Sequence, residues 1–277
     1  MDHLAYCEDK LAHPDSDYPL LRVFLDEDSR CLHAALQTLR LELLSIPDEI
    51  NDPELAQTKL HWWREELLRF AEGEARHPVT RLLSNYRDAI APEAILHMTL
   101  AIDELLQTGS TWNNFDALYA HCLLISGTPV SLEAGARGLD DDARAVAQRI
   151  GAAAHLTRLI ANLRADAANN RLSVPMDELA RFQVTRKDLQ GGTQTEAVVE
   201  LLSYQTARVA ALYTEALAAL SPSQRYALLP WTLRARLDQA RLAQTPRADL
   251  QLRLTPLKRL WIAWRTARRT KREALGM

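Results

Sequence analysis

Histidines, cysteines and glycine-rich stretches often reveal catalytic chemistry in a sequence, and here their spacing excludes the common sites. His61, His121 and His155 stand at no spacing typical of metal ligands, so we expect hydrogen-bonded structural residues. Cys7 and His3 are too loosely placed for a metal pair or an activated nucleophile. No phosphate-cradling loop or Gly-x-Ser-x-Gly elbow occurs, since the Gly-Gly pair at 191–192 lacks a following Lys-Ser/Thr.

The charged residues are unevenly distributed. The chain has a net charge of −3, but the segment from Ser221 to the end carries thirteen Lys and Arg against three acidic residues. Such a segment suits an anionic partner, either phosphate or a membrane surface, or is simply a solvated face. Basic residues are not interleaved with aromatic ones on a strand platform, so nucleic acid is not an expected partner.

An amphipathic helix is predicted from Pro256 onwards. Its apolar stripe is surrounded by Lys and Arg and consists of Leu257, Leu260, Trp261 and Trp264. One interpretation packs this helix on its own domain and leaves a solvated basic face. The alternative is contact with an anionic membrane, where each basic residue near the surface adds about 1 kcal/mol.

The elements that must position any site are helices. Only nine glycines occur in 277 residues, Leu and Ala are abundant, and no useful period-two strand pattern appears. Prolines stand where first helical turns tolerate them, as in Asp52-Pro53 and Ser221-Pro222. The sequence therefore predicts an all-α fold of about nine or ten helices.

Three of these helices have predicted ends. The apolar stripe from Leu32 to Ile46 is expected to end at Pro47. A helix over 116–126 should stop at Gly127-Thr128-Pro129, and the acidic triplet Asp140–Asp142 should open a long helix running to about Asn170.

A single domain over residues 1–277 is expected, with residues 1–16 as a loosely ordered N-terminus. No linker or internal repeat divides the chain, and no apolar run reaches the length of a membrane span. Three cysteines without paired spacing (Cys7, Cys31 and Cys122) favour a reduced, cytoplasmic location, which the basic end could make membrane-peripheral.

Three segments together resemble a known family. They are LELLSIPDEINDP at 41–53 followed by LHWWREE at 60–66, NLRAD at 162–166 leading into RLSVPMDEL at 171–179, and LLP at 228–230 with LTPLKRLW at 254–261. In order and approximate spacing they resemble the squalene/phytoene synthase family, from about Asp17 to Arg269. The resemblance implies an all-α isoprenoid-synthase fold around a deep apolar cavity, and enzymes that join two isoprenyl diphosphates head to head.

Such enzymes hold magnesium on aspartates of two facing helices, because magnesium neutralises the departing diphosphate. Here the first motif is replaced by Leu43, Leu44 and Pro47, with Asp48 and Glu49 expected to point elsewhere. The second motif is reduced to Asn162 and Asp166. Asp166 is the remaining candidate magnesium ligand, and an exposed carboxylate beside Arg164 is the alternative.

The resemblance also assigns binding residues. Arg22, Arg40 and Arg171 lie where the family places diphosphate-facing cations, and surface salt bridges are the alternative. Trp62 and Trp63 are expected in the core or the cavity wall, with a ligand role as the alternative. We expect Leu43, Leu44, Trp62 and Ile160 to line a large apolar pocket.

Two functions remain open at this level. The stretch before Trp62 resembles a divergent branch of the family that includes the mitochondrial assembly factor for respiratory complex I, which also lacks the paired aspartates. This favours an isoprenoid-binding or assembly protein, with an isoprenoid, an isoprenyl diphosphate or a protein of a larger complex as partner, and no standard turnover. The alternative is an active prenyl-diphosphate transferase that uses magnesium on atypical ligands.

Overall fold

The computed structural model describes residues 2–13, 16–191, 195–244 and 254–276. These residues form α-helices and short helical turns, without a β-strand among them. The helices of the first half are α1 (His3–Leu11), α2 (Tyr18–Leu21), η1 (Arg22–Phe24), α3 (Glu27–Glu49), α4 (Pro53–Glu72), α5 (Pro78–Leu83), η2 (Ser84–Tyr86), α6 (Pro92–Thr108), α7 (Phe115–Cys122), η3 (Leu123–Gly127) and α8 (Thr128–Ala136). Those of the second half are α9 (Asp141–Ala168), α10 (Met176–Arg181), α11 (Arg186–Gln190), α12 (Glu196–Ala219), α13 (Pro222–Ala227), α14 (Leu229–Leu242) and α15 (Pro256–Ala274).

The helix starts are set by the side chains that the sequence suggests. Asp52 and Ser221 each precede a proline and accept hydrogen bonds from the free backbone N–H groups of the first turn. Asp140 does the same for Ala143 at the start of the long helix α9. The all-α prediction is therefore confirmed, although the described residues contain fifteen α-helices rather than nine or ten.

Several predicted ends are wrong. Pro47 lies inside α3, which continues to Glu49, because the preceding turns are held by packing of Leu43 and Ile46 in the core. The chain does not stop at Gly127 either, since the π-helical turn η3 joins α7 directly to α8. Within the segment 1–16 that was expected to be loosely ordered, His3–Leu11 form α1, which buries Cys7 and Leu11 against α3 and α5.

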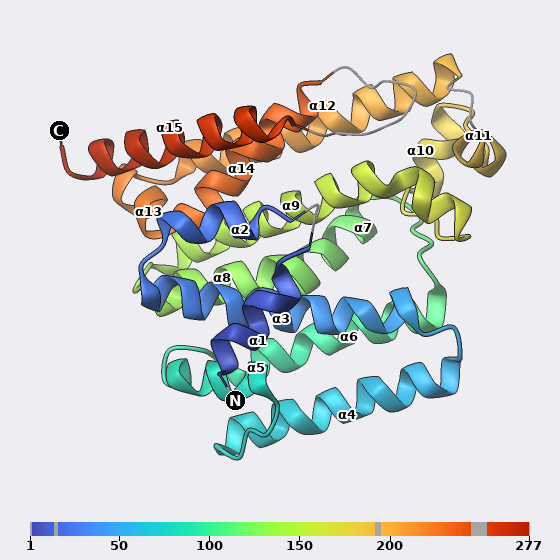
Figure 1. Ribbon diagram of the computed structural model, residues 1–277. Helices are drawn as coiled ribbons and strands as arrows, with labels where there is room; N and C mark the ends of the chain where they lie inside the picture. Colours follow the sequence, from blue (N-terminus) through green and yellow to red (C-terminus); the bar gives the residue numbers. More distant parts are fainter. Residues whose placement is uncertain (1, 14–15, 192–194, 245–253, 277) are drawn as a thin grey trace.

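Three clusters of buried hydrophobic side chains form the interior of the described part of the chain. A first core is built mainly by α1 and α3–α6, a second core mainly by α7, α9, α12 and α14, and a small third cluster by residues of α2, α14 and α15 with Leu254. Helix α9 contacts α7, α8, α12 and α14, so it forms the spine of the second core. In Figure 1, α12, α14 and α15 lie on one side of α9, and α3, α4 and α6 lie on the other.

A buried ion-pair network, here called the Asp17 clamp, ties the N-terminal segment to the C-terminal helices. Asp17 accepts hydrogen bonds from Arg241 at 2.6 and 2.7 Å and from Arg259 at 2.8 Å. Asp238 is fully buried and accepts from Tyr213, Arg234 and Arg241. The clamp therefore consists of Asp17, Tyr213, Arg234, Asp238, Arg241 and Arg259.

Candidate functional site

Charged and polar side chains gather around a small cavity between α3 and α9, here called the head chamber. The cavity measures about 40 Å³. From α3 come Leu44 and Asp48, and from the loop after α9 come Arg171 and Ser173. Helices α7 and α9 supply the rest of its charged and titratable lining, which is His121, His155, Arg158 and Asp166.

Arg171 joins the two carboxylates of the head chamber. Its guanidinium donates to Asp48 at 2.8 Å and lies 3.8 Å from Asp166. Burial raises the pKa of Asp166, and the neighbouring charge of Asp48 adds to that rise against the lowering effect of Arg158 and Arg171. The two acids are therefore held together by a protein cation.

This donor set does not fit a cluster of several magnesium ions. Each ion needs several oxygen ligands and is usually held by one or two carboxylates together with water and substrate phosphates, so two carboxylates are too few for a cluster. Among the described residues no three Asp, Glu, His or Cys side chains are grouped so that they could hold a metal ion. Asn162, which takes the place of the missing acid, is exposed on α9. The two carboxylates present already share Arg171 as an ion-pair partner.

A polar chain leads from α3 into the head chamber. Arg40 donates to Gln37 at 3.1 Å and reaches Ser126 at 3.4 Å, and Ser126 lies 2.7 Å from Nδ1 of His155. The other ring nitrogen of His155 lies 3.4 Å from Arg158. Ser126 can come this close because Gly151 carries no side chain, and a Cβ there would overlap the Ser126 carbonyl oxygen.

The side chains of this polar network carry positive charge that no carboxylate pairs with in the described part of the protein. Neither Arg40 nor Arg158 has an acidic partner within ion-pair distance in the described part of the chain. Burial, together with the charges of Arg158 and Arg234, lowers the pKa of Arg40 to about 9. Burial and then Arg158 lower the pKa of His121 to about 4, and that of His155 also falls well below its ordinary value. Both rings are neutral at pH 7, and the site favours an anion.

The head chamber opens outward into a larger cleft, the outer cleft, of about 280 Å³. Leu44, Asp48 and Arg158 line both spaces. The outer cleft adds Lys59 from α4 and Lys10 from α1, the latter paired with Glu42 at 3.0 Å.

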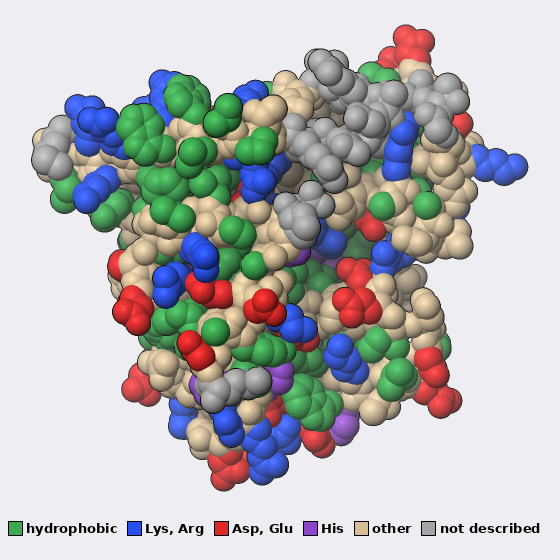
Figure 2. All heavy atoms as spheres, in the orientation of Figure 1, with side chains coloured by type: hydrophobic (Ala, Val, Ile, Leu, Met, Phe, Trp, Pro, Cys, Tyr) green, Lys and Arg blue, Asp and Glu red, His purple; other side chains and the backbone are tan. Residues whose placement is uncertain are grey.

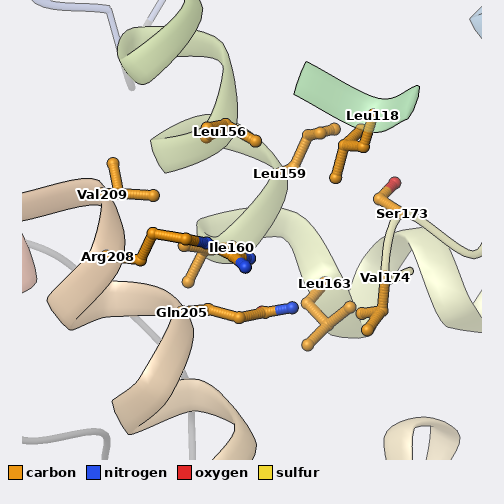
Figure 3. A pocket seen from close by; sticks show the side chains of 10 residues that line it. All are labelled: Leu118, Leu156, Leu159, Ile160, Leu163, Ser173, Val174, Gln205, Arg208 and Val209. Carbon is orange, nitrogen blue, oxygen red and sulfur yellow. The ribbon is translucent and has the colours of Figure 1, made fainter. Parts of the chain in front are cut away.

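On its inner side the head chamber adjoins an apolar slot between α7, α9 and α12 (Figure 3). Leu118, Leu159 and Ser173 line both cavities. The slot measures only about 20 Å³ because leucine and isoleucine side chains fill it. Arg208 and Gln205 form its α12 wall, and both donate to the buried Glu178, at 2.5 and 2.8 Å.

The residues that the sequence predicted as its lining therefore do not form a large apolar pocket. Leu43 is fully buried in the packed core, and Trp62 is 42% exposed on the surface. Leu44 and Ile160 do reach cavities, but two different ones. Close packing of Leu43 with the surrounding helices explains why no space opens on that side of α3.

The structure separates the other predicted residues. Arg171 lines the head chamber, and Arg40 is connected to it only through Ser126 and His155. Arg22 is half exposed and paired with Glu8 at 3.1 Å, away from the chamber lining. Trp63 is buried in the core and packs edge-on against Trp62 and His77, which fits the core interpretation.

Sequence reasoning missed two residues of the head chamber. Asp48 was expected to point elsewhere, but α3 continues past Pro47 and places it beside Arg171. Arg158 was not singled out, although it stands four residues before Asn162 and eight before Asp166. That spacing puts all three on one face of α9 and could have identified it.

Comparison with known proteins agrees with this fold. A family model described as squalene/phytoene synthase matches residues 11–265. The phytoene synthase of Arthrospira platensis is 27% identical over 217 residues, which cover 67% of this chain and 66% of that protein. Phytoene synthase 1 of Arabidopsis thaliana is 27% identical over 114 residues, which cover 39% and 27%. The chain thus matches less than two thirds of the length of these relatives.

Solved structures share the architecture. A dehydrosqualene synthase in complex with ligand superposes with a TM-score of 0.82 at 18% identity, covering 97% of this chain and 96% of that one. The squalene synthase HpnC from Alicyclobacillus acidocaldarius superposes with a TM-score of 0.69 at 19% identity, covering 97% and 94%. At these identities the likeness shows the fold alone. The family match over most of its length establishes that the chain belongs to the squalene/phytoene synthase family.

Proposed function

We propose that this protein binds an isoprenyl diphosphate through arginines and does not perform the magnesium-dependent head-to-head condensation. The observation that carries this proposal is the guanidinium of Arg171 between Asp48 and Asp166. A departing diphosphate needs concentrated positive charge, which magnesium on carboxylates supplies. Here a protein cation pairs with both carboxylates, which lowers their capacity to recruit a metal cluster.

The uncompensated cations support anion binding. Arg40 and Arg158 are partly buried and repel one another, as the lowered pKa of Arg40 indicates. A diphosphate at the junction of the head chamber and the outer cleft would relieve this repulsion, and a guanidinium can donate two parallel hydrogen bonds to it. Binding a diphosphate requires less electrostatic stabilisation than ionising it, because ionisation places additional negative charge on the departing diphosphate.

The isoprenoid chain would enter the apolar slot, and the slot must widen to receive it. Pockets for small molecules usually measure about 300–1,000 Å³, whereas the slot measures about 20 Å³. Its apolar walls on α7 and α9 suit a hydrocarbon chain, and the polar wall residues Gln205 and Arg208 each donate a hydrogen bond to Glu178.

One observation favours a second candidate, an active prenyl-diphosphate transferase with atypical magnesium ligands. Asp48 remains in α3 and lies on the same guanidinium as Asp166, so two acids of facing helices do converge. For this function Arg171 would have to leave both carboxylates when magnesium binds.

An assembly role also belongs to this proposal. The resemblance of residues 41–53 and of Trp62-Trp63 to the mitochondrial assembly factor supports it. A protein partner would need a surface outside the head chamber. Trp62 is the aromatic side chain of that stretch which is exposed for such a contact.

Product analysis separates the binding role from the transferase. The protein is incubated with farnesyl or geranylgeranyl diphosphate and magnesium, beside an Asp166→Ala variant. We expect no squalene- or phytoene-like product from either. Magnesium-dependent product that is lost in Asp166→Ala would establish the transferase instead.

A further inference from the structure

Helix α15 leaves an amphipathic face without a partner on the protein's own surface. The four apolar residues of its predicted stripe do not pack inward. Leu257 is 80% exposed, Leu260 52%, Trp261 54% and Trp264 49%. The helix is instead anchored by its opposite face, where Ala263 and Thr270 are buried and Arg259 joins the Asp17 clamp. About half or more of each of these apolar side chains therefore remains exposed to solvent on the outer face of the helix.

The same exposed face is strongly cationic. Arg265 lies over the ring of Trp261 at 5.0 Å, and Arg268 lies over that of Trp264 at 5.4 Å. Lys258, Arg265, Arg268, Lys271 and Arg272 have no acidic partner in the described part of the chain, because Glu273 pairs with Arg269 and Arg225. In Figure 2, hydrophobic and basic side chains lie side by side along the edge of the molecule where α15 runs in Figure 1.

We propose that this face of α15 docks on an anionic lipid bilayer. Tryptophans are favoured at the depth of the lipid headgroups, and an amphipathic helix with basic and aromatic residues lies in the plane of that interface. No described helix is long and apolar enough to cross a bilayer. The proposed contact is made by the side chains of one amphipathic helix lying along the bilayer surface.

The charge distribution gives this docking one orientation. The segment from Ser221 onwards carries a net +10, so the rest of the chain carries −13. An anionic surface repels the acidic part and attracts α15. The proposal does not depend on the diphosphate site, because no residue of α15 lines the head chamber or the outer cleft.

Co-sedimentation with lipid vesicles tests the proposal. One set of vesicles contains phosphatidylcholine alone, and the other adds phosphatidylglycerol. We expect the full-length protein to bind the anionic vesicles at least about tenfold more tightly than the neutral ones, and added salt to weaken this binding. Equal binding to both, or binding to neither, would overturn the proposal.

Variants identify the face. Arg265→Gln, Arg268→Gln, Lys271→Gln and Arg272→Gln combined should reduce binding to anionic vesicles about tenfold or more. Trp261→Ser with Trp264→Ser should reduce it severalfold, since the rings no longer insert. The matched control is Arg186→Gln with Lys187→Gln, two exposed cations on α11, which should change nothing.

All these side chains are exposed, so thermal unfolding of each variant should match that of the unchanged protein. Diphosphate affinity in the absence of lipid should also be unchanged, which separates a failure here from a failure of the proposed function. Undiminished vesicle binding by both α15 variants would show that another surface binds the lipid and would overturn the assignment.

Discussion

The Asp17 clamp and the surroundings of the head chamber each combine three arginines with two aspartates, but the arginines are paired differently. In the clamp every guanidinium donates to a carboxylate, at distances of 2.6–2.8 Å. In the head chamber Arg171 serves both acids, while Arg40 and Arg158 have none within ion-pair distance in the described chain. A network in which every guanidinium has a carboxylate partner holds a structure together, whereas guanidiniums without such a partner can receive an anionic ligand.

The pKa values follow the same division. Burial opposes ionisation of Asp17, but the hydrogen bond from Arg241 and the charges of Arg234, Arg241 and Arg259 lower its pKa to about 2. Burial raises the pKa of Asp166, where the nearby cations only partly offset it. The surroundings therefore stabilise the anionic form of Asp17 but not that of Asp166.

Breaking the clamp should have the largest effect on stability. We expect Asp238→Asn to lower the free energy of unfolding by about 3 kcal/mol, because it leaves buried guanidiniums and Tyr213 without their charged acceptor. Asp48→Asn is the matched control, since it removes the same charge from an exposed ion pair and should cost less than about 1 kcal/mol. Urea denaturation of both variants measures the difference. Equal losses would contradict the contrast between the two sites.

Acid should weaken the clamp through Asp17. Its folded pKa of about 2 lies below its ordinary value of 3.8, so its ion pairs stabilise the protein above about pH 4. This contribution, about 2 kcal/mol, should be lost as the pH falls from about 4 to about 2. The unfolding free energies of the protein and of Asp17→Asn should therefore converge over that range. A difference that stays constant with pH would argue against ionised Asp17 as the source.

Removing an arginine that has no acidic partner should affect diphosphate binding rather than stability. We expect Arg158→Met to weaken farnesyl diphosphate binding at least about tenfold, which corresponds to about 1.4 kcal/mol, because a charge-assisted bond is lost. Arg22→Met is the control, since Arg22 pairs with Glu8 outside the head chamber. Calorimetric titration measures both, and similar affinities for the two variants would place the anion elsewhere.

The smallest effect is expected at the bridge itself. Asp48→Asn removes the closer acceptor of Arg171 and one negative charge beside the expected anion. Diphosphate affinity should therefore rise by about twofold to fivefold. A fall in affinity in the presence of magnesium would instead indicate that Asp48 is a metal ligand.

The fold could largely be predicted from the sequence, whereas the candidate site could be predicted only in part. Capping residues and apolar spacing are local signals, so the all-α class and the long helix α9 could be predicted. Pro47 was a misleading local signal, because tertiary packing keeps α3 helical through it and thereby places Asp48. The clamp joins Asp17 to Arg241 across 224 residues, and no spacing rule reaches that far.

The size of the cavity could not be predicted from the sequence, because it also depends on tertiary packing. The resemblance indicated a deep apolar pocket, whose size depends on how far side chains from several helices fill it. Leu156, Leu159, Ile160 and Leu163 fill the space along α9, and no single residue of that run announces this in the sequence. Whether the apolar stripe of α15 is exposed could likewise not be predicted, since an amphipathic pattern does not determine which face packs against the protein.

The central claim is that arginines, not magnesium, hold the diphosphate. The most direct test is calorimetric titration of farnesyl diphosphate into the protein in EDTA and again in magnesium. We predict binding in EDTA with an affinity within about threefold of that in magnesium, and a loss of that EDTA binding in Arg158→Met. Binding that appears only with magnesium and is abolished by Asp166→Ala would contradict the claim.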